Sequence, residues 1–145
     1  MIDGVTNAGS IPVLKKMAQF AGRRHTLLAN NLANLSTPNY RAVDVSVEGF
    51  RTQLREAVDE RRAERGNLGG DLPMRSTAQV SVSGDGTLQL HGQHVGSELM
   101  HQDGNDRNVE REMQQLVENT MMYRQMMEML RSRFNLINTA IRERM

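Results

Sequence analysis

The 145-residue sequence contains no cysteine, which excludes disulfide bonds, thiolate metal ligands and a cysteine nucleophile. Tryptophan is also absent, aromatic residues make up 3% of the chain, and only 38% of residues are hydrophobic. This apolar content is low for a protein with a compact core and fits an elongated helical protein better. The length fits one domain of ordinary size, or a smaller folded part joined to a flexible part.

The sequence also lacks an excess of charge of one sign and any long apolar run. It has 18 basic and 17 acidic residues, whereas proteins that bind nucleic acid usually show a clear basic excess. No stretch approaches the roughly 18 consecutive apolar residues of a membrane-spanning helix. The first ten residues carry neither a basic cluster nor an apolar core, so we expect no ordinary secretory signal. We therefore predict no nucleic-acid partner, no membrane span, and export, if any, by another route.

The chain divides into three regions, at 1–42, 43–107 and 108–145. We expect the first region to form a helix and a turn. The last should form a coiled-coil helix that packs with the first. The middle region is variable in composition and partly flexible.

The first helix is expected from about 11 to 35. Ser10 is a suitable N-cap, and Pro12 lies in the first turn, where its missing N–H group costs little. Pro38 stops the helix, and the Pro38-Asn39 pair favours a turn. Residues of one helical face recur at alternating steps of four and three: Leu14, Ala18, Ala21, His25, Leu28, Leu32 and Leu35. On that face, His25 is interpreted as a packed histidine rather than a base.

The last helix has a stronger periodicity, sustained over more than four heptads. A repeat of 3.5 residues indicates a coiled-coil seam. The predicted seam is Val109, Met113, Leu116, Thr120, Tyr123, Met127, Leu130, Phe134, Ile137 and Ile141. A second apolar set flanks it: Met122, Met126, Met129, Leu136 and Ala140.

The middle region predicts less regular structure. A short solvated helix is expected from about 48 to 65, and a small hairpin from Val80 to Leu90 around a Gly-Asp-Gly turn. The rest of 66–104 is glycine-rich and expected to be mobile in the isolated subunit. The predicted fold class is mainly α: long terminal helices form a coiled-coil-like pair, and the irregular middle region holds the short helix and the hairpin.

The two terminal helices differ in length, so the first cannot cover the last along its whole seam. Burying an apolar side chain stabilises by roughly 1.5–3 kcal/mol before opposing terms. We therefore expect association with copies of this chain or with similar subunits. The alternative is that the helix at 48–65 covers the second apolar set within the same chain, giving a three-helix arrangement.

Residues suited to catalysis or metal binding are sparse. The best metal candidates, His91, His94 and His101, lie in the glycine-rich region without a cysteine or a fixed frame, so a solvated polar loop is the preferred interpretation. Neither "GNLGGD" nor "SGDGT" has the lysine of a phosphate-binding loop, and no G-x-S-x-G motif occurs. We predict no enzymatic activity, no cofactor and no metal site.

The segment "NNLANLSTPNYRA" resembles the N-terminal signature of the bacterial flagellar rod and hook proteins, approximately N-x-A-N-x-x-T-P-x-Y-x-A. Asn39 stands where that family usually has Gly, and Asn also tolerates the left-handed conformation. The matching residues are Asn31, Ala33, Asn34, Thr37, Pro38, Tyr40 and Ala42.

The C-terminal half resembles the proximal rod members of that family. "GNDRNVEREM" is similar to their G-N-x-V-[DN]-x-x-x-E segment, except that Arg107 replaces Val. The following run has their N-x-x-x-Y spacing at Asn119 and Tyr123, and their terminal K/R-F-x-x-[LI] pattern at 133–137. The P-N-V-[DN] segment of the other short rod proteins is absent. The two motifs cover about 55 residues, and 43–103 carries no resemblance.

The resemblance implies a structural subunit of the flagellar basal-body rod, which transmits torque across the periplasm. Such subunits are exported unfolded by the flagellar type III apparatus without a cleaved signal. The implied partners are copies of the chain, other rod proteins, and the base of the rod at the export gate and MS ring. The predicted assembly interface is Asn31, Asn34, Thr37, Pro38, Tyr40, Met113, Leu116, Tyr123, Met127, Leu130, Phe134, Ile137 and Ile141.

Two other functions remain as alternatives. One is a soluble coiled-coil adaptor or chaperone that binds partner helices. The other is an enzyme or metal protein centred on His91, His94 and His101. We also make a hypothesis about the asparagines at the end of the first helix. Asn31 and Asn34 lie where the helix meets neighbouring subunits, and their amides bond to those subunits and fix the orientation. Their alternative role is to be solvated and to fray the helix.

Overall fold

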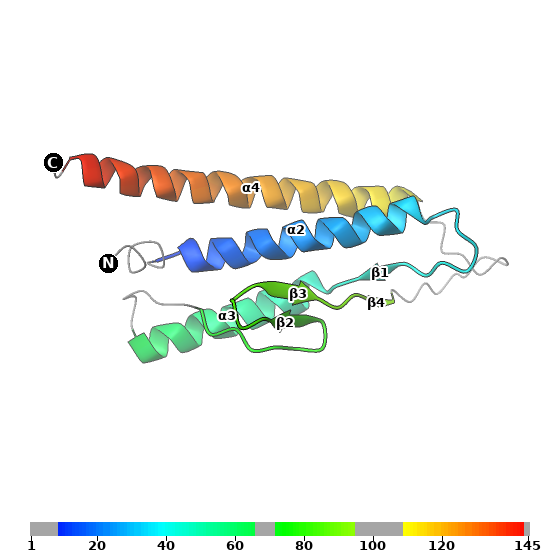
Figure 1. Ribbon diagram of the computed structural model, residues 1–145, viewed down its shortest axis with the longest axis horizontal. Helices are drawn as coiled ribbons and strands as arrows, with labels where there is room; N and C mark the ends of the chain where they lie inside the picture. The colour runs from blue at the N-terminus through cyan, green and yellow to red at the C-terminus, as the bar shows by residue number, and fades with distance from the viewer. Residues whose placement is uncertain (1–8, 66–71, 95–108, 144–145) are drawn as a thin grey trace.

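The computed structural model describes residues 9–65, 72–94 and 109–143 (Figure 1). The helices are α2 (Ile11–Ala33), α3 (Val47–Arg65) and α4 (Val109–Arg142). The strands are β1 (Val43–Asp44), β2 (Val80–Val82), β3 (Leu88–Leu90) and β4 (Gln93–His94). The predicted mainly helical fold, with long terminal helices, a short middle helix and a hairpin, is confirmed. The short β1–β4 pair was not predicted.

The elements form three layers with α2 in the middle (Figure 1). Helix α4 covers one side of α2 and runs antiparallel to it, whereas α3 and the β2–β3 hairpin cover the other side. The C-terminal end of α4 extends beyond the described start of α2. Because α2 is buried from both sides, it contributes side chains to two separate apolar clusters.

Backbone hydrogen bonds close both ends of helix α2, and no side chain caps its N-terminus. Pro12 lies in the first turn, as expected, but the Ser10 side chain makes no capping bond. Only the Ser10 carbonyl takes part, accepting from the Leu14 N–H group at 3.0 Å. The predicted capping role of the Ser10 hydroxyl is therefore wrong. The helix ends at Ala33, two residues before the predicted limit, where the Asn34 N–H group donates back into the last turn.

The larger apolar cluster joins α2 to α3, the hairpin and the preceding loop. At its centre the rings of Phe20 and Phe50 are stacked, with centroids 4.0 Å apart and planes 7° apart. Its buried members are Phe20, Val45, Phe50, Leu54, Ala57, Leu72, Met74, Val80 and Leu88. Leu72 and Met74 come from the stretch predicted to be mobile, and that prediction is wrong there, because both are buried against the α2–α3 core. The remaining parts of that stretch, 66–71 and 95–104, lie outside the described residues.

The two strand pairs attach the middle region to α2. In the hairpin, Val80 pairs with Leu90, and Gly86 occupies the turn with φ +78°. The Lys16 ammonium group on α2 is largely buried and donates to the Gly86 carbonyl at 2.5 Å. This bond fixes the tip of the hairpin to α2. The other pair, β1 with β4, is antiparallel and brings the chain after the first turn beside the strand that follows the hairpin.

The smaller cluster joins α2 to α4 near the start of α2. Its buried members are Ile11, Leu14, Ala18, Met126 and Leu130, with Phe134 and Ile137 packed against them. The alternative in which α3 covers the second apolar set of α4 is wrong for most of that set, because α3 lies on the far side of α2 (Figure 1). Only Met122 packs against the larger cluster, while Met129, Leu136 and Ala140 remain exposed.

Replacing Phe20 by Ala should cost about 3–5 kcal/mol of unfolding free energy, because it removes a fully buried ring and leaves a cavity against Phe50. Urea unfolding followed by circular dichroism measures the loss. Phe134→Ala is the matched control. That ring is only half-buried, so roughly half the loss is expected. Equal losses for the two variants would contradict the assignment of the main core.

Candidate assembly surface

The first predicted interface residue, Asn31, is buried at the end of α2 and uses its whole amide within the chain. Its side chain is 1% exposed. The Nδ2 group donates to the Val43 carbonyl at 2.9 Å and to Glu112 Oε2 at 3.3 Å. The Oδ1 atom accepts from the Tyr40 hydroxyl at 2.9 Å and from the Val43 N–H group at 3.1 Å. Asn31 therefore joins α2 to the chain after the turn and to α4, and makes no further bond available to a neighbour.

Asn34 instead stabilises the end of α2. Its Nδ2 group donates to the Asn30 carbonyl at 2.9 Å, and its Oδ1 atom accepts from the Thr37 hydroxyl at 3.4 Å. The chain then reverses through Pro38 and Asn39, and Asn39 has φ +61°, as position three of a type II turn requires. The predicted turn is confirmed. Thr37 and Pro38 are exposed at its tip, so they belong to the outer surface of the chain.

An ion pair that sequence reasoning missed holds β1 against α2. The Arg24 guanidinium donates to both carboxylate oxygens of Asp44, at 2.8 and 2.5 Å. Both side chains are mostly buried, and removing one partner would leave the other charge unpaired in a poorly hydrated site. The exposed pairs on α3 and α4, such as Arg131 with Glu128, contribute far less.

Polar residues also set the register of α4 on α2. Asn119 is buried, and its Nδ2 group donates to the Ala21 carbonyl at 2.8 Å. One turn farther along, the Tyr123 ring lies over Gly22, where an added Cβ would sit 3.5 Å from the ring. Glu112 is buried near the other end of the contact, beside Asn31. The contact between the two helices is therefore defined by two polar anchors and a small-residue site, as well as by the apolar cluster.

The α2-facing side of α4 differs from the predicted seam. Its buried residues are Glu112, Asn119, Met126 and Leu130. Of the predicted seam, Leu130 is buried, Leu116, Thr120, Phe134 and Ile137 are half-buried, and Val109, Met113, Tyr123, Met127 and Ile141 are exposed. The error arises because polar residues were not counted as buried. Glu112, Asn119 and Met126 recur at intervals of seven, but the apolar set has the same period, so the spacing alone does not select the buried face.

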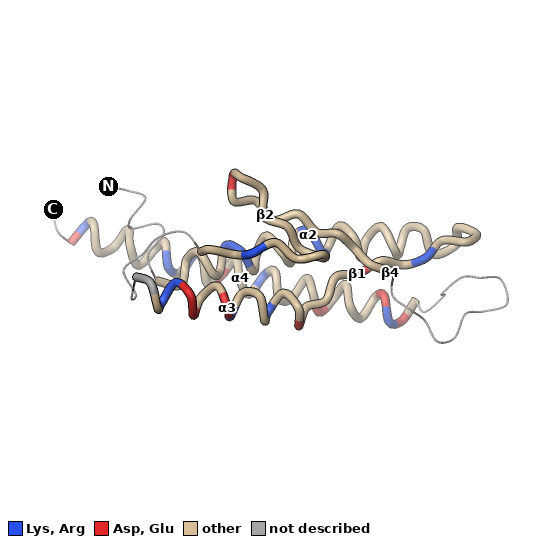
Figure 2. The backbone as a smooth tube through the Cα atoms, turned by 90° about the horizontal axis from the view of Figure 1, so that it is seen from below, with Lys and Arg blue, Asp and Glu red and all other residues tan. Residues whose placement is uncertain are grey.

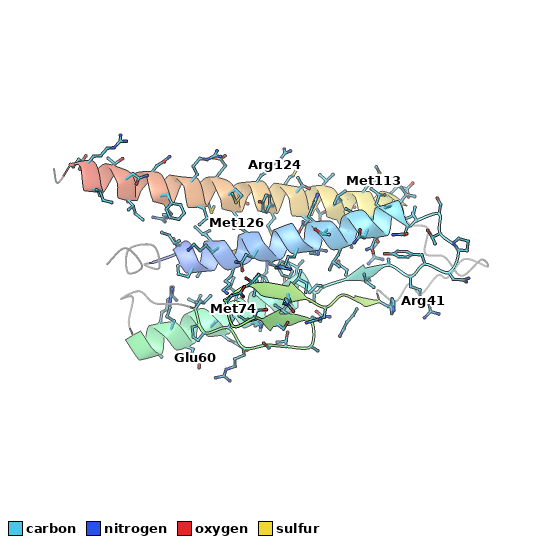
Figure 3. The ribbon with its side chains drawn as sticks, viewed as in Figure 1. Arg41, Glu60, Met74, Met113, Arg124 and Met126 are labelled. Carbon is cyan, nitrogen blue, oxygen red and sulfur yellow. The ribbon has the colours of Figure 1, made fainter. Side chains whose placement is uncertain are left out.

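The exposed apolar residues of α4 are the main candidate for an assembly surface. Figure 3 shows Met113 and Arg124 on the outer side of this helix, away from α2, and Met126 on the side facing it. The large exposed apolar residues are Val109, Met113, Val117, Met121, Tyr123, Met127, Met129, Leu136 and Ile141. A single α-helix that exposes so many apolar side chains presents the kind of surface that marks an interaction site.

The other candidate residues do not form a reactive group in the described part of the chain. His25, predicted to be packed, is exposed and lies 3.4 Å from the Thr120 hydroxyl, so that prediction is wrong. His91 lies 2.9 Å from the Ser81 hydroxyl on the exposed hairpin, and His94 lies on β4. His101 lies outside the described residues. Within the described ranges, no three His, Asp or Glu side chains gather as metal ligands.

The charge and the hydropathy of the helices add two observations. Lys and Arg are interspersed with Asp and Glu along α3 and α4 (Figure 2). In the ranges described, none of the helices has the length and apolar character needed to cross a membrane.

The environment of Tyr40 gives an electrostatic test of the turn. Burial raises the pKa of the Tyr40 hydroxyl above 10.0, and the negative charge of Glu112 raises it further. Both effects favour the neutral phenol, which donates to Asn31. A raised folded-state pKa means that this stabilisation is complete below the pKa of the unfolded chain and is lost as the pH rises through the folded value.

We expect Asn31→Ala to lower the unfolding free energy by about 1–3 kcal/mol, because the Val43 backbone groups and the Tyr40 hydroxyl lose a buried partner. Asn34→Ala is the matched control in the same segment. It should change stability by no more than about 0.5 kcal/mol, since the hydrogen bond that it loses is exposed to solvent and leaves no buried group without a partner. Urea titrations of the two variants measure the difference, and equal effects would contradict the role assigned to Asn31.

In a Tyr123→Phe background, Tyr40 is the one remaining tyrosine, and its ultraviolet absorbance reports its ionisation. We expect it to titrate above the value of a free tyrosine. Adding Glu112→Gln should lower the Tyr40 pKa, because the negative charge is removed while the hydrogen-bonding shape is kept. The pKa should nevertheless stay raised, since burial is the larger cause. A Tyr40 pKa that Glu112→Gln leaves unchanged would argue against the contact between the turn and α4.

Comparison with known proteins agrees with the resemblance in the sequence. No family model matches the chain. The flagellar basal body rod protein FlgB of Bacillus subtilis (strain 168) is 25% identical to it over 134 residues, which cover 92% of this chain and 94% of that protein. The similarity therefore includes the middle region, beyond the two terminal segments that carry the motifs. Over nearly its whole length, this chain is similar to a flagellar rod protein.

Proposed function

We propose that this chain is a structural subunit of the flagellar basal-body rod, at its proximal end, and that it assembles through its terminal helices, with the uncovered side of α4 as the main contact surface. The observation that carries the proposal is the uncovered apolar surface of α4, in a chain similar to a rod protein over 92% of its length. A subunit of an assembly needs such a surface, because contacts with neighbours replace the solvent that covers it in the isolated chain.

The predicted interface residues fall into two groups under this proposal. Met113, Met127 and Ile141 are exposed on α4 and available to neighbours, whereas Tyr123 is partly exposed but packs its ring over Gly22 of α2. The buried Leu130 and the half-buried Leu116, Phe134 and Ile137 support assembly indirectly, by holding α4 against α2. Asn31 and Tyr40 likewise act through the turn, whose tip at Thr37 and Pro38 is exposed to solvent and would face a neighbouring subunit.

The partners and the location follow from the same proposal. The neighbours are copies of this chain, other rod proteins, and the base of the rod at the export gate and MS ring. The rod lies in the periplasm and transmits torque, and the chain reaches it through the flagellar type III apparatus without a cleaved signal. This function requires neither a catalytic centre nor a cofactor.

The first experiment deletes the gene and examines the cell surface and isolated basal bodies by electron microscopy. Loss of rod, hook and filament, restored by the wild-type gene, is the expected result. Intact flagella after deletion would remove the rod assignment and favour a soluble coiled-coil adaptor or chaperone.

A second experiment asks whether the exposed apolar surface is needed. Met127→Glu with Ile141→Glu should abolish rod assembly and motility, because two charges are placed on the proposed contact surface, while the purified chain keeps its helix content and unfolding midpoint. The control is Ser132→Glu with Asn135→Glu, two exposed polar positions on the same helix, which should remain motile. Wild-type motility in the Met127/Ile141 variant would contradict assembly through this surface.

A further inference from the structure

The outer face of α4 carries a self-complementary pattern at 110–124. Glu110, Met113, Val117, Met121 and Arg124 follow one another at steps of three, four, four and three. At about 100° per residue, the five positions lie within an arc of roughly 80° on one face of the helix. The spacing is symmetric about Val117. The three central positions are apolar, and the two end positions carry opposite charges.

All five side chains are exposed and uncommitted. Met113 and Val117 are each 52% exposed, and Met121 is 65% exposed. Glu110 and Arg124 are exposed and make no ion pair or side-chain hydrogen bond within the described ranges. The face points away from α2 and the layers beneath it, as Met113 and Arg124 show in Figure 3. A second helix can therefore approach it without meeting the other elements that the structure describes.

We propose that two copies of this chain pair through this face, with their α4 helices antiparallel and a two-fold axis at Val117. In this register, Met113 lies across from the partner's Met121, and Glu110 lies across from the partner's Arg124. Each ion pair occurs twice by symmetry. A parallel pairing in register would instead place Glu110 against the partner's Glu110 and Arg124 against the partner's Arg124, which is repulsive at both ends.

The pattern favours a copy of this chain over an unrelated helix. The acidic end, the basic end and the apolar centre lie on one face, so the same face on a second, antiparallel copy complements it. The contact spans 15 residues, or roughly 20 Å of helix, which is small for a stable interface. We therefore expect a weak dimer that forms at micromolar concentrations or above. A two-fold contact closes on itself and does not extend into a tube. The pairing is therefore independent of the proposed rod function and is a state of the free subunit.

Sedimentation equilibrium of the purified chain over a range of concentrations tests the pairing. Glu110→Arg and Arg124→Glu should each weaken the dimer about three- to tenfold, because each creates like-charge contacts at both ends. Combining the two substitutions should restore wild-type affinity, since the opposite charges face one another again. Glu118→Arg is the control: it makes the same charge change on the same helix, about 100° away from the centre of the face, and should leave the affinity unchanged. A chain that stays monomeric at all concentrations, or a double variant no better than the singles, would overturn the proposal.

Cysteine cross-linking tests the direction of the helices, and the chain has no native cysteine to interfere. Val117→Cys should form a disulfide-linked dimer under mild oxidation, because this residue lies beside its own copy. Chains with Met113→Cys should cross-link poorly with one another but readily with chains carrying Met121→Cys. Efficient linking of Met113→Cys to itself would indicate a parallel contact and overturn the antiparallel pairing. Circular dichroism of each variant shows whether α4 remains folded.

Discussion

The central constraint on this fold is that α2 must satisfy two cores at once. Phe20 faces α3 and the hairpin, while Leu14 and Ala18 face α4. A helix covered from both sides cannot rotate or slide without breaking one set of contacts, so the packing of α3 and α4 is coupled through it. The buried Lys16 and Arg24 follow from the same constraint, because a helix with few free faces must bury some of its polar residues and supply partners for them.

The asparagines at the end of α2 also provide hydrogen-bond partners for polar groups near the end of the helix. The chain leaves the helix, reverses at Pro38 and Asn39, and returns along α2, where the N–H and carbonyl groups of Val43 bond to Asn31. The short side chain of Asn31 makes four hydrogen bonds: its Nδ2 group donates two and its Oδ1 atom accepts two. Asn34 acts differently, on the exposed end of the helix. The poor helix propensity of asparagine is the cost of ending a helix in this way.

Periodicity and turn chemistry predicted the existence, type and approximate limits of the helices, the hairpin and the turn. They could not predict the face of α4 that meets α2, since hydrophobicity alone cannot distinguish an apolar residue that packs within the chain from one left for a neighbour. Met126 is buried and Met113 is exposed, although both are methionines in the same helix. Glu112 and Asn119 are buried because α2 offers them partners, and those partners depend on tertiary structure. The ion pair of Arg24 with Asp44 was missed for the same reason.

The methionines on the uncovered side of α4 give this surface a chemical sensitivity that leucine would not. A thioether packs as an apolar group but becomes a polar sulfoxide when it is oxidised. Met113, Met121, Met127 and Met129 are open to oxidants, whereas Met126 is shielded between α4 and α2. Oxidation would therefore fall first on the outer surface of α4, leaving a chain that is correctly folded but whose proposed assembly surface has become polar. Its recovery would depend on a reductase rather than on refolding.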